Sequence, residues 1–154
     1  EREARFGQRG ATVLITGLTG SGKRLVAHAL ERRLFDSGRA CTLLDGPKMR
    51  LGVSKDLGFT PEGRSENMRR AAECARLLND AGLIAIASFL APHKEVRDKA
   101  RDVVGSDRFI EVFLNVPLSL QHRSPWRRLP RVSTREKGLV YHSIRGGDTL
   151  YRAR

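Results

Sequence analysis

The chain has 154 residues, of which 40% are hydrophobic and 30% charged, and its formal net charge at pH 7 is +12. This length and a mean hydropathy of -0.40 are typical of one soluble domain that buries its own hydrophobic core. No stretch approaches the ~18 to 20 apolar residues of a membrane span and the polar start is no secretory signal, so we expect no membrane partner and a cytoplasmic location.

Residues 1–10 form a polar flank, and Glu1 stands where a complete chain would begin with methionine. We therefore interpret the chain as a fragment of a longer polypeptide. An apolar run at residues 13–15 predicts the first strand, and apolar residues at helical spacing between 25 and 34 predict the first long helix.

A glycine-rich loop joins this strand to this helix, which is the context that a phosphate-binding loop requires. Its glycines let successive backbone N–H groups point inward, where they and the helix N-terminus can hold a polyphosphate. Lys23 would reach the β- and γ-phosphates; the alternative is a glycine-rich turn that binds nothing. We predict that ATP is bound by Gly17, Leu18, Thr19, Gly20, Ser21, Gly22, Lys23 and Arg24.

The last position of this loop departs from the usual pattern. Phosphate-binding loops end in Ser or Thr because the hydroxyl oxygen ligates the magnesium that accompanies the nucleotide. Arg24 has five donors and no acceptor, so it can contact phosphate but cannot ligate a cation. The loop therefore predicts phosphate binding, whereas the signal for phosphoryl transfer is weaker.

The next predicted strand, residues 40–44, ends at Asp45. In parallel α/β sheets ligands collect outside the carboxyl ends of the strands, so a carboxylate beside the phosphate loop is well placed to hold magnesium. We predict Asp45 as a magnesium ligand. The alternative is that Asp45 only caps the short helix that follows.

Residues 61 to about 81 predict a helix, with Thr60 as its N-cap and Pro61 in its first turn. Three arginines, Arg64, Arg69 and Arg70, lie in its first turns. Arginine side chains usually lie on the solvent-exposed face of a helix, but these three follow a strand end where an anionic substrate could lie.

Continuous apolar sequence at residues 83–89 predicts a central strand that is covered on both faces. Residues 94 to about 104 predict a charged helix, and residues 109–116 a fourth strand. Because helices separate the strands, the pattern predicts an α/β fold: a P-loop NTPase-like parallel sheet flanked by helices, in three α/β/α layers.

Cys41 and Cys74 lie far apart without a partner motif, and we expect two buried free thiols rather than a disulfide or a metal site. The four histidines are scattered, so we expect no zinc site.

Residues 123–154 show no sustained periodicity and hold nine Lys or Arg against two acidic residues, which leaves a net charge of +5 for residues 1–122. An excess of this size is ordinary for a domain with anionic nucleotide ligands, and the tail has no nucleic-acid motif, so we expect no specific nucleic-acid partner. We divide the chain into a flank (1–10), a nucleotide-binding domain (11–122) and a basic tail (123–154) that we expect to be poorly ordered.

Several separated motifs in residues 11–122 resemble adenylylsulfate kinase. They are the G-L-T-G-S-G-K loop, Leu44-Asp45-Gly46 followed by Arg50, residues 55–59, Arg64 with Glu66-Asn67 and Arg69-Arg70, and residues 81–83, 89–92 and 109–113. The resemblance implies that ATP, with magnesium, phosphorylates the 3'-hydroxyl of adenosine 5'-phosphosulfate in sulfate assimilation. It also implies a homodimer and an ATP sulfurylase domain or subunit as partners.

The resemblance further implies roles for particular residues. Lys23 and Asp45 would be catalytic. The substrate would be bound by Arg50, Phe59, Arg64, Asn67 and Leu90. The residue types agree with these roles, because arginine forks suit phosphate and sulfate oxygens and an aromatic ring suits a flat base.

Four positions depart from the family pattern. Arg24 replaces the hydroxyl after the lysine, Pro47 replaces the second aspartate of D-G-D-N, and Ala91 replaces a serine that the family uses as a phosphorylated intermediate site. Ser124 replaces an aspartate in the lid that begins at Arg123. The alternative function is therefore a catalytically impaired regulatory domain that binds nucleotides beside ATP sulfurylase, and residues 123–154 can be read as native, truncated or frame-shifted.

Overall fold

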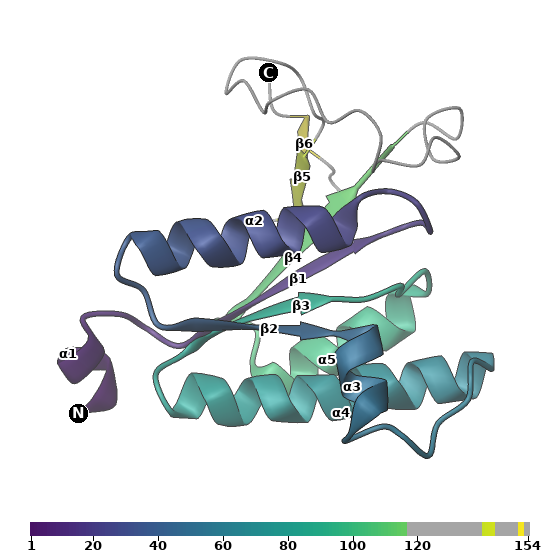
Figure 1. Cartoon of the computed structure of the whole chain (residues 1–154), viewed down its shortest axis with the longest axis horizontal. Coiled ribbons are helices and arrows are strands. Elements are labelled where there is room, and N and C mark those ends of the chain that lie inside the picture. Colours follow the sequence, from purple (N-terminus) through teal and green to yellow (C-terminus); the bar gives the residue numbers. More distant parts are fainter. Residues whose placement is uncertain (117–139, 144–150, 153–154) are drawn as a thin grey trace.

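A twisted sheet divides the molecule into three layers (Figure 1). The computed structural model describes residues 1–116, 140–143 and 151–152. The chain order of the elements is α1 (Arg2–Phe6), β1 (Ala11–Gly17), α2 (Lys23–Asp36), β2 (Cys41–Asp45), α3 (Gly46–Leu51), α4 (Pro61–Asp80), β3 (Ile84–Ser88), α5 (Lys94–Val104), β4 (Phe109–Leu114), β5 (Val140–Ser143) and β6 (Tyr151–Arg152).

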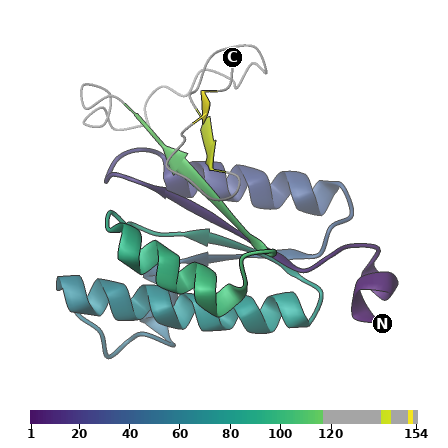
Figure 2. The same ribbon diagram turned by 180° about the vertical axis from the view of Figure 1, so that it is seen from behind.

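The strands are ordered β2-β3-β1-β4-β5-β6. The first four are parallel, and their register pairs Leu14 with Ala87 on one side and with Glu111 on the other. Helix α2 covers one face of the sheet, while α4 and α5 cover the other (Figures 1 and 2). The predicted three-layer α/β fold with a parallel sheet is confirmed.

Each face of the sheet has its own hydrophobic core, because neighbouring strand residues point to opposite faces. Leu14 is buried with the α4 and α5 side chains Met68 and Ala100, whereas Ile15 is buried with Ala27 of α2. The exposed fraction of both strand residues is 1% or less. Because both faces of the strands are buried, the strand sequences are continuous apolar runs and do not alternate between apolar and polar residues.

Local sequence signals set the ends of the long helix α4. The Thr60 side chain accepts a hydrogen bond from the Gly63 N–H at 3.1 Å, and Pro61 occupies the first turn. Thr60 satisfies a donor that would otherwise lack a partner at the helix start, and Pro61 has no N–H to satisfy. The predicted N-cap is confirmed.

The flank at residues 1–10 is attached to the sheet through Gln8. Its side-chain amide donates to the carbonyls of Ala40 and Gly82, both at 2.8 Å, and its oxygen accepts from the Ala40 N–H at 2.9 Å. Gln8 therefore ties the flank to the residues that precede β2 and β3.

The basic tail includes two short strands that the sequence did not predict. Strand β5 pairs antiparallel with β4, and β6 pairs antiparallel with β5. Val140 and Tyr141 are types that favour strands, but this short signal is surrounded by arginine and glycine. The boundary at residues 122/123, Arg123, Ser124 and most of the expected disordered tail lie outside the described residues.

Within the described ranges, no helix is both long enough and apolar enough to cross a membrane. Cys41 and Cys74 are free, as predicted, but they are half-buried rather than buried. The same part of the chain holds no cluster of three or more His, Cys, Asp or Glu side chains that could bind a metal ion.

Candidate nucleotide-binding site

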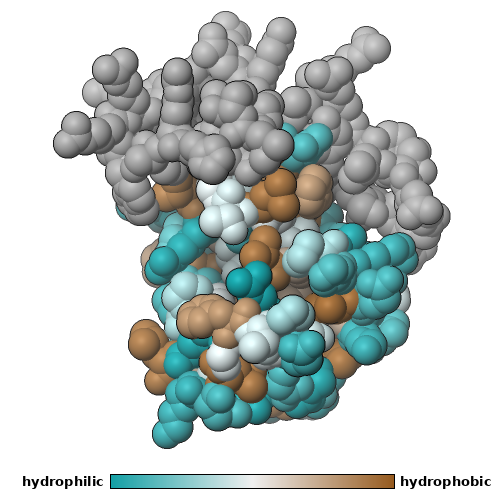
Figure 3. All heavy atoms as spheres, turned by 90° about the vertical axis from the view of Figure 1, so that its right-hand side faces the viewer, coloured by the Kyte–Doolittle hydropathy of each residue, from teal (hydrophilic) through white to brown (hydrophobic). Residues whose placement is uncertain are grey.

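A cavity of about 800 Å³ opens where β1, β2 and β3 end. Figure 3 shows this face of the molecule, where apolar and polar side chains lie side by side. The parallel strands all bring their carboxyl ends to this edge, so residues that are distant in sequence meet here. The cavity is lined by Thr19, Gly20, Gly22, Lys23, Arg24, Leu25, Asp45, Gly46, Pro47, Arg50, Phe59, Arg64, Asn67, Ser88, Phe89 and Leu90.

Backbone geometry shapes the glycine loop between β1 and α2. Gly22 precedes α2 with φ of 79°, a conformation that residues with a Cβ rarely adopt. At Gly17 a Cβ atom would lie 2.9 Å from the carbonyl oxygen of Leu114 on the neighbouring strand. The N–H of Ser21 donates to the Leu18 carbonyl at 3.1 Å, which closes the loop into a turn.

Lys23 is the first residue of α2 and lines the cavity. Its ammonium group donates to the Leu18 carbonyl at 3.1 Å, and among the described residues it has no acidic partner. Burial lowers the pKa of Lys23, because a charged ammonium is less stable where water is partly excluded. A phosphate would be a stronger acceptor for this ammonium than the neutral carbonyl.

The Asp45 carboxylate is 1% exposed and has two neighbours. Oδ1 accepts the Lys48 N–H at 2.7 Å and thereby caps α3, which is the alternative role that the sequence left open. Oδ2 lies 3.0 Å from Nε of Arg24, but their orientation does not form a hydrogen bond. The contact is therefore an ion pair, and Oδ2 can still accept a hydrogen bond from another group.

A second buried acceptor lies on the cavity wall. Asn67 is 3% exposed, and its Oδ1 has no hydrogen-bond partner. Leaving such an atom without a donor costs about 1–3 kcal/mol. Asp45 and Asn67 thus present two acceptors to a ligand that carries hydroxyl or amino groups.

The structure brings all five predicted substrate-binding residues to this cavity. Arg50 donates to the carbonyls of Leu57 and Gly58 at 2.9 and 2.8 Å, and its guanidinium carbon lies 4.5 Å from the centre of the Phe59 ring. Phe59 is 73% exposed, so its ring is accessible to a flat ligand. The side chain of Arg64 forms no ion pair or hydrogen bond with any described residue.

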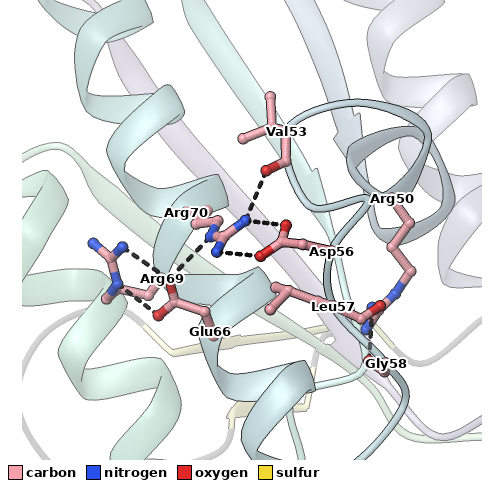
Figure 4. A network of polar contacts seen from close by, with 8 residues as sticks. All are labelled: Arg50, Val53, Asp56, Leu57, Gly58, Glu66, Arg69 and Arg70. Carbon is pink, nitrogen blue, oxygen red and sulfur yellow. Dashed lines mark hydrogen bonds and ion pairs between the residues drawn. The ribbon is translucent and has the colours of Figure 1, made fainter.

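The other two arginines of the predicted cluster, Arg69 and Arg70, do not line the cavity, so of the three only Arg64 lies where an anionic substrate could contact it. Arg70 pairs with Asp56 at 2.6 Å and with Glu66 at 3.0 Å, and Arg69 pairs with Glu66 at 2.8 Å (Figure 4). The hydrogen bonds from Arg69 and Arg70 lower the pKa of Glu66 to about 2. The spacing of three and four residues between Glu66 and these arginines is the sequence signal that could have revealed the network.

This network holds the loop between α3 and α4. Arg70 also donates to the Val53 carbonyl at 2.8 Å (Figure 4). Loop residues 53–56 are thereby attached to α4, and the same loop leads to Phe59. Asp56, which the sequence analysis noted only as part of a motif, is therefore a structural anchor.

Sequence reasoning missed several residues of the cavity wall, including Leu25, Gly46 and Ser88. They have no distinctive chemistry, and only the meeting of strand ends places them here.

Pro47 lies in the first turn of α3, where it supplies no N–H to a ligand. Ala91 is 3% exposed, and its N–H donates to the Thr16 hydroxyl at 3.3 Å.

The adenylylsulphate kinase family model matches residues 9–151, a range that extends into the basic tail. The bifunctional enzyme CysN/CysC of Rhodopirellula baltica is 53% identical over 120 residues, which cover 78% of this chain and 18% of that protein. The adenylyl-sulfate kinase of Klebsiella pneumoniae is 48% identical over 154 residues, which cover 99% of this chain and 75% of its own. The chain thus spans less than a fifth of the bifunctional relative.

Solved structures agree with these sequence matches. The Mycobacterium tuberculosis APS kinase CysC, in complex with AMPPNP and APS, has a TM-score of 0.71 and 42% identity, covering 75% of this chain and 68% of that one. A hexameric APS kinase from Thiobacillus denitrificans has a TM-score of 0.65 and 33% identity, covering 84% of this chain and 24% of that one.

Proposed function

This chain belongs to the adenylylsulphate kinase family, and we propose that it transfers the γ-phosphoryl group of ATP to the 3'-hydroxyl of adenosine 5'-phosphosulfate. The observation that supports this proposal is a cavity that combines a phosphate-binding loop with two arginines, an exposed ring and two buried acceptors that lack a hydrogen-bond partner. The product is 3'-phosphoadenylylsulfate, an intermediate of sulfate assimilation.

On the donor side, we propose that residues 17–24 bind ATP. Backbone N–H groups of the loop and the N-terminus of α2 hold the phosphates, and Lys23 turns from the Leu18 carbonyl to the β- and γ-phosphates. The contribution of these groups is position and charge neutralisation, which supply most of the rate enhancement in phosphoryl transfer.

On the acceptor side, Arg64 and Arg50 bind the phosphosulfate, the ring of Phe59 stacks on the adenine, and Asn67 and Leu90 complete the nucleoside contacts. The 3'-oxygen forms a bond to the γ-phosphorus while the bond from that phosphorus to the β,γ-bridging oxygen breaks, and ADP leaves. Asp45 Oδ2 accepts the proton of the 3'-hydroxyl, since this oxygen is free to accept a hydrogen bond.

Magnesium is the cofactor that normally supplies charge neutralisation in this chemistry. Asp45 is the one carboxylate on the described cavity wall, and a guanidinium already lies 3.0 Å from its Oδ2. Arg24 also supplies no oxygen where the family has a hydroxyl. These residues therefore do not fit a metal ion held by the protein, and the Asp45–magnesium contact expected from the sequence is not part of this proposal.

The Arg24–Asp45 ion pair favours a second candidate function, a domain that binds nucleotides without turnover and regulates an associated ATP sulfurylase. The bifunctional relative is compatible with fusion to another enzyme. Under either function we infer a homodimer and a cytoplasmic location; the hexameric relative shows that assembly occurs among similar kinases.

The deciding experiment measures 3'-phosphoadenylylsulfate by anion-exchange chromatography after incubation with ATP, magnesium and adenosine 5'-phosphosulfate. Product that requires Lys23 supports the kinase. Binding of both nucleotides by calorimetry without product supports the regulatory domain, and in that case the double variant Arg24→Ser with Pro47→Asp should gain turnover. Failure to bind either nucleotide contradicts both functions.

A further inference from the structure

The cation beside the buried carboxylate of this site is part of the chain itself. Arg24, the second residue of α2, places Nε 3.0 Å from Oδ2 of Asp45 at the end of β2. No other Lys, Arg or His among the described residues forms an ion pair with Asp45. The guanidinium thus links the start of α2, directly after the phosphate loop, to the end of β2.

Most of the donor capacity of this guanidinium is unused. A guanidinium has five N–H donors, and Nε accounts for one of them. Within the part of the chain that the structure describes, the side chain of Arg24 makes no hydrogen bond and no second ion pair. Its side chain is 58% exposed and lines the cavity, so the remaining donors are accessible to a ligand.

The net positive charge of the cavity wall suits a polyanionic ligand that binds without an accompanying metal ion. The described wall contains four cationic side chains and one carboxylate; the cations are Lys23, Arg24, Arg50 and Arg64. A divalent cation at Asp45 would have to displace the guanidinium or lie beside it against like-charge repulsion. A polyphosphate would instead be attracted to Arg24, because arginine binds phosphate oxygens with two parallel N–H bonds.

We propose that Arg24 takes the place of magnesium in nucleotide binding: Asp45 orients its guanidinium, which binds the terminal phosphates of a nucleoside triphosphate, so that affinity does not depend on a divalent cation. The inference rests on the proposed nucleotide-binding function and adds a ligand requirement to it. It concerns binding and is independent of turnover.

The test is calorimetric titration with the non-hydrolysable triphosphate AMPPNP, in excess magnesium and in excess EDTA. For the unmodified chain we expect dissociation constants that agree within about threefold in the two buffers, since a factor of three corresponds to little free energy. For Arg24→Ser we expect metal-free binding to weaken about tenfold or more, as for loss of a hydrogen bond between charged groups, and magnesium to restore part of the affinity.

Three further measurements keep the outcome interpretable. Arg32→Ser on α2 removes the same charge from a side chain that is 84% exposed, and it should leave both dissociation constants unchanged. Arg24→Lys keeps the positive charge but loses the planar guanidinium that can donate two parallel N–H bonds. Its affinity for AMPPNP without metal should therefore lie between those of the unmodified chain and Arg24→Ser. Thermal melts of each variant verify folding, and a folded Arg24→Lys protein tests the proposal even if Arg24→Ser does not fold.

Two results would overturn the inference: an unmodified chain that binds AMPPNP only with magnesium, or an Arg24→Ser protein with undiminished metal-free affinity. An unmodified chain that binds in neither buffer would contradict the proposed phosphate-loop function itself. The two failures are therefore distinguishable.

Discussion

Replacing Arg64 with alanine should weaken the binding of adenosine 5'-phosphosulfate while leaving the fold intact. Arg64 is exposed and lines the cavity, and its side chain contacts no described residue through a hydrogen bond or ion pair, so truncating this side chain costs the folded protein little. In the complex, however, its loss removes a charged hydrogen-bonding partner of the phosphosulfate.

The size of the effect follows from this exposure. A hydrogen bond to a charged group contributes about 1.5–3 kcal/mol, which corresponds to a roughly 10- to 150-fold loss of affinity. Truncating one partner of a fully buried charge pair would cost about 2–5 kcal/mol of binding free energy. Arg64 is exposed, so water reaches the site and partly replaces the lost contact.

The chain provides a matched control on the same helix. Arg69→Ala also removes one arginine, but that side chain is paired with Glu66 and does not line the cavity. Isothermal titration with adenosine 5'-phosphosulfate should show a large loss for Arg64→Ala and a change below about twofold for Arg69→Ala. Equal affinities for the two variants would refute the assignment of Arg64 to the substrate.

Three more predictions concern the phosphate loop, the ion-pair network and the flank. Lys23→Ala should weaken ATP binding at least about tenfold in calorimetry because a charged phosphate contact is lost, and equal affinity would contradict the phosphate-loop interpretation. Since the Glu66 pKa is lowered from 4.5 to about 2, its stabilising effect should be fully present above about pH 4.5 and lost as the pH falls towards 2. The difference in Tm between the unmodified protein and Glu66→Gln should shrink over that range, and a constant difference would argue against the network. Gln8→Ala should lower the free energy of unfolding by about 2–4 kcal/mol in urea melts, whereas Arg5→Ala, at an exposed position of the same flank, should change it by less than about 0.5 kcal/mol.

Features that depend on neighbouring residues were predictable from the sequence. The strand–loop–helix context of residues 13–34, the Thr60 cap and the parallel α/β architecture all follow from periodicity and from residue types at fixed spacing. These signals are reliable because the hydrogen bonds of a helix cap and the periodic placement of apolar side chains involve residues only a few positions apart in the sequence.

Only the tertiary structure decided which charged groups face each other. The sequence grouped Arg64, Arg69 and Arg70 as a cluster that could face an anionic substrate, but successive helix residues point in different directions, and Arg69 and Arg70 pair with Glu66 instead. Similarly, Asp45 was predicted to hold magnesium or to cap α3. The cap is present, and the neighbouring cation is Arg24, which is 21 positions earlier in the chain. Such a contact depends on how β2 and the start of α2 approach one another across the sheet edge, and that distance is set by packing rather than by spacing along the sequence.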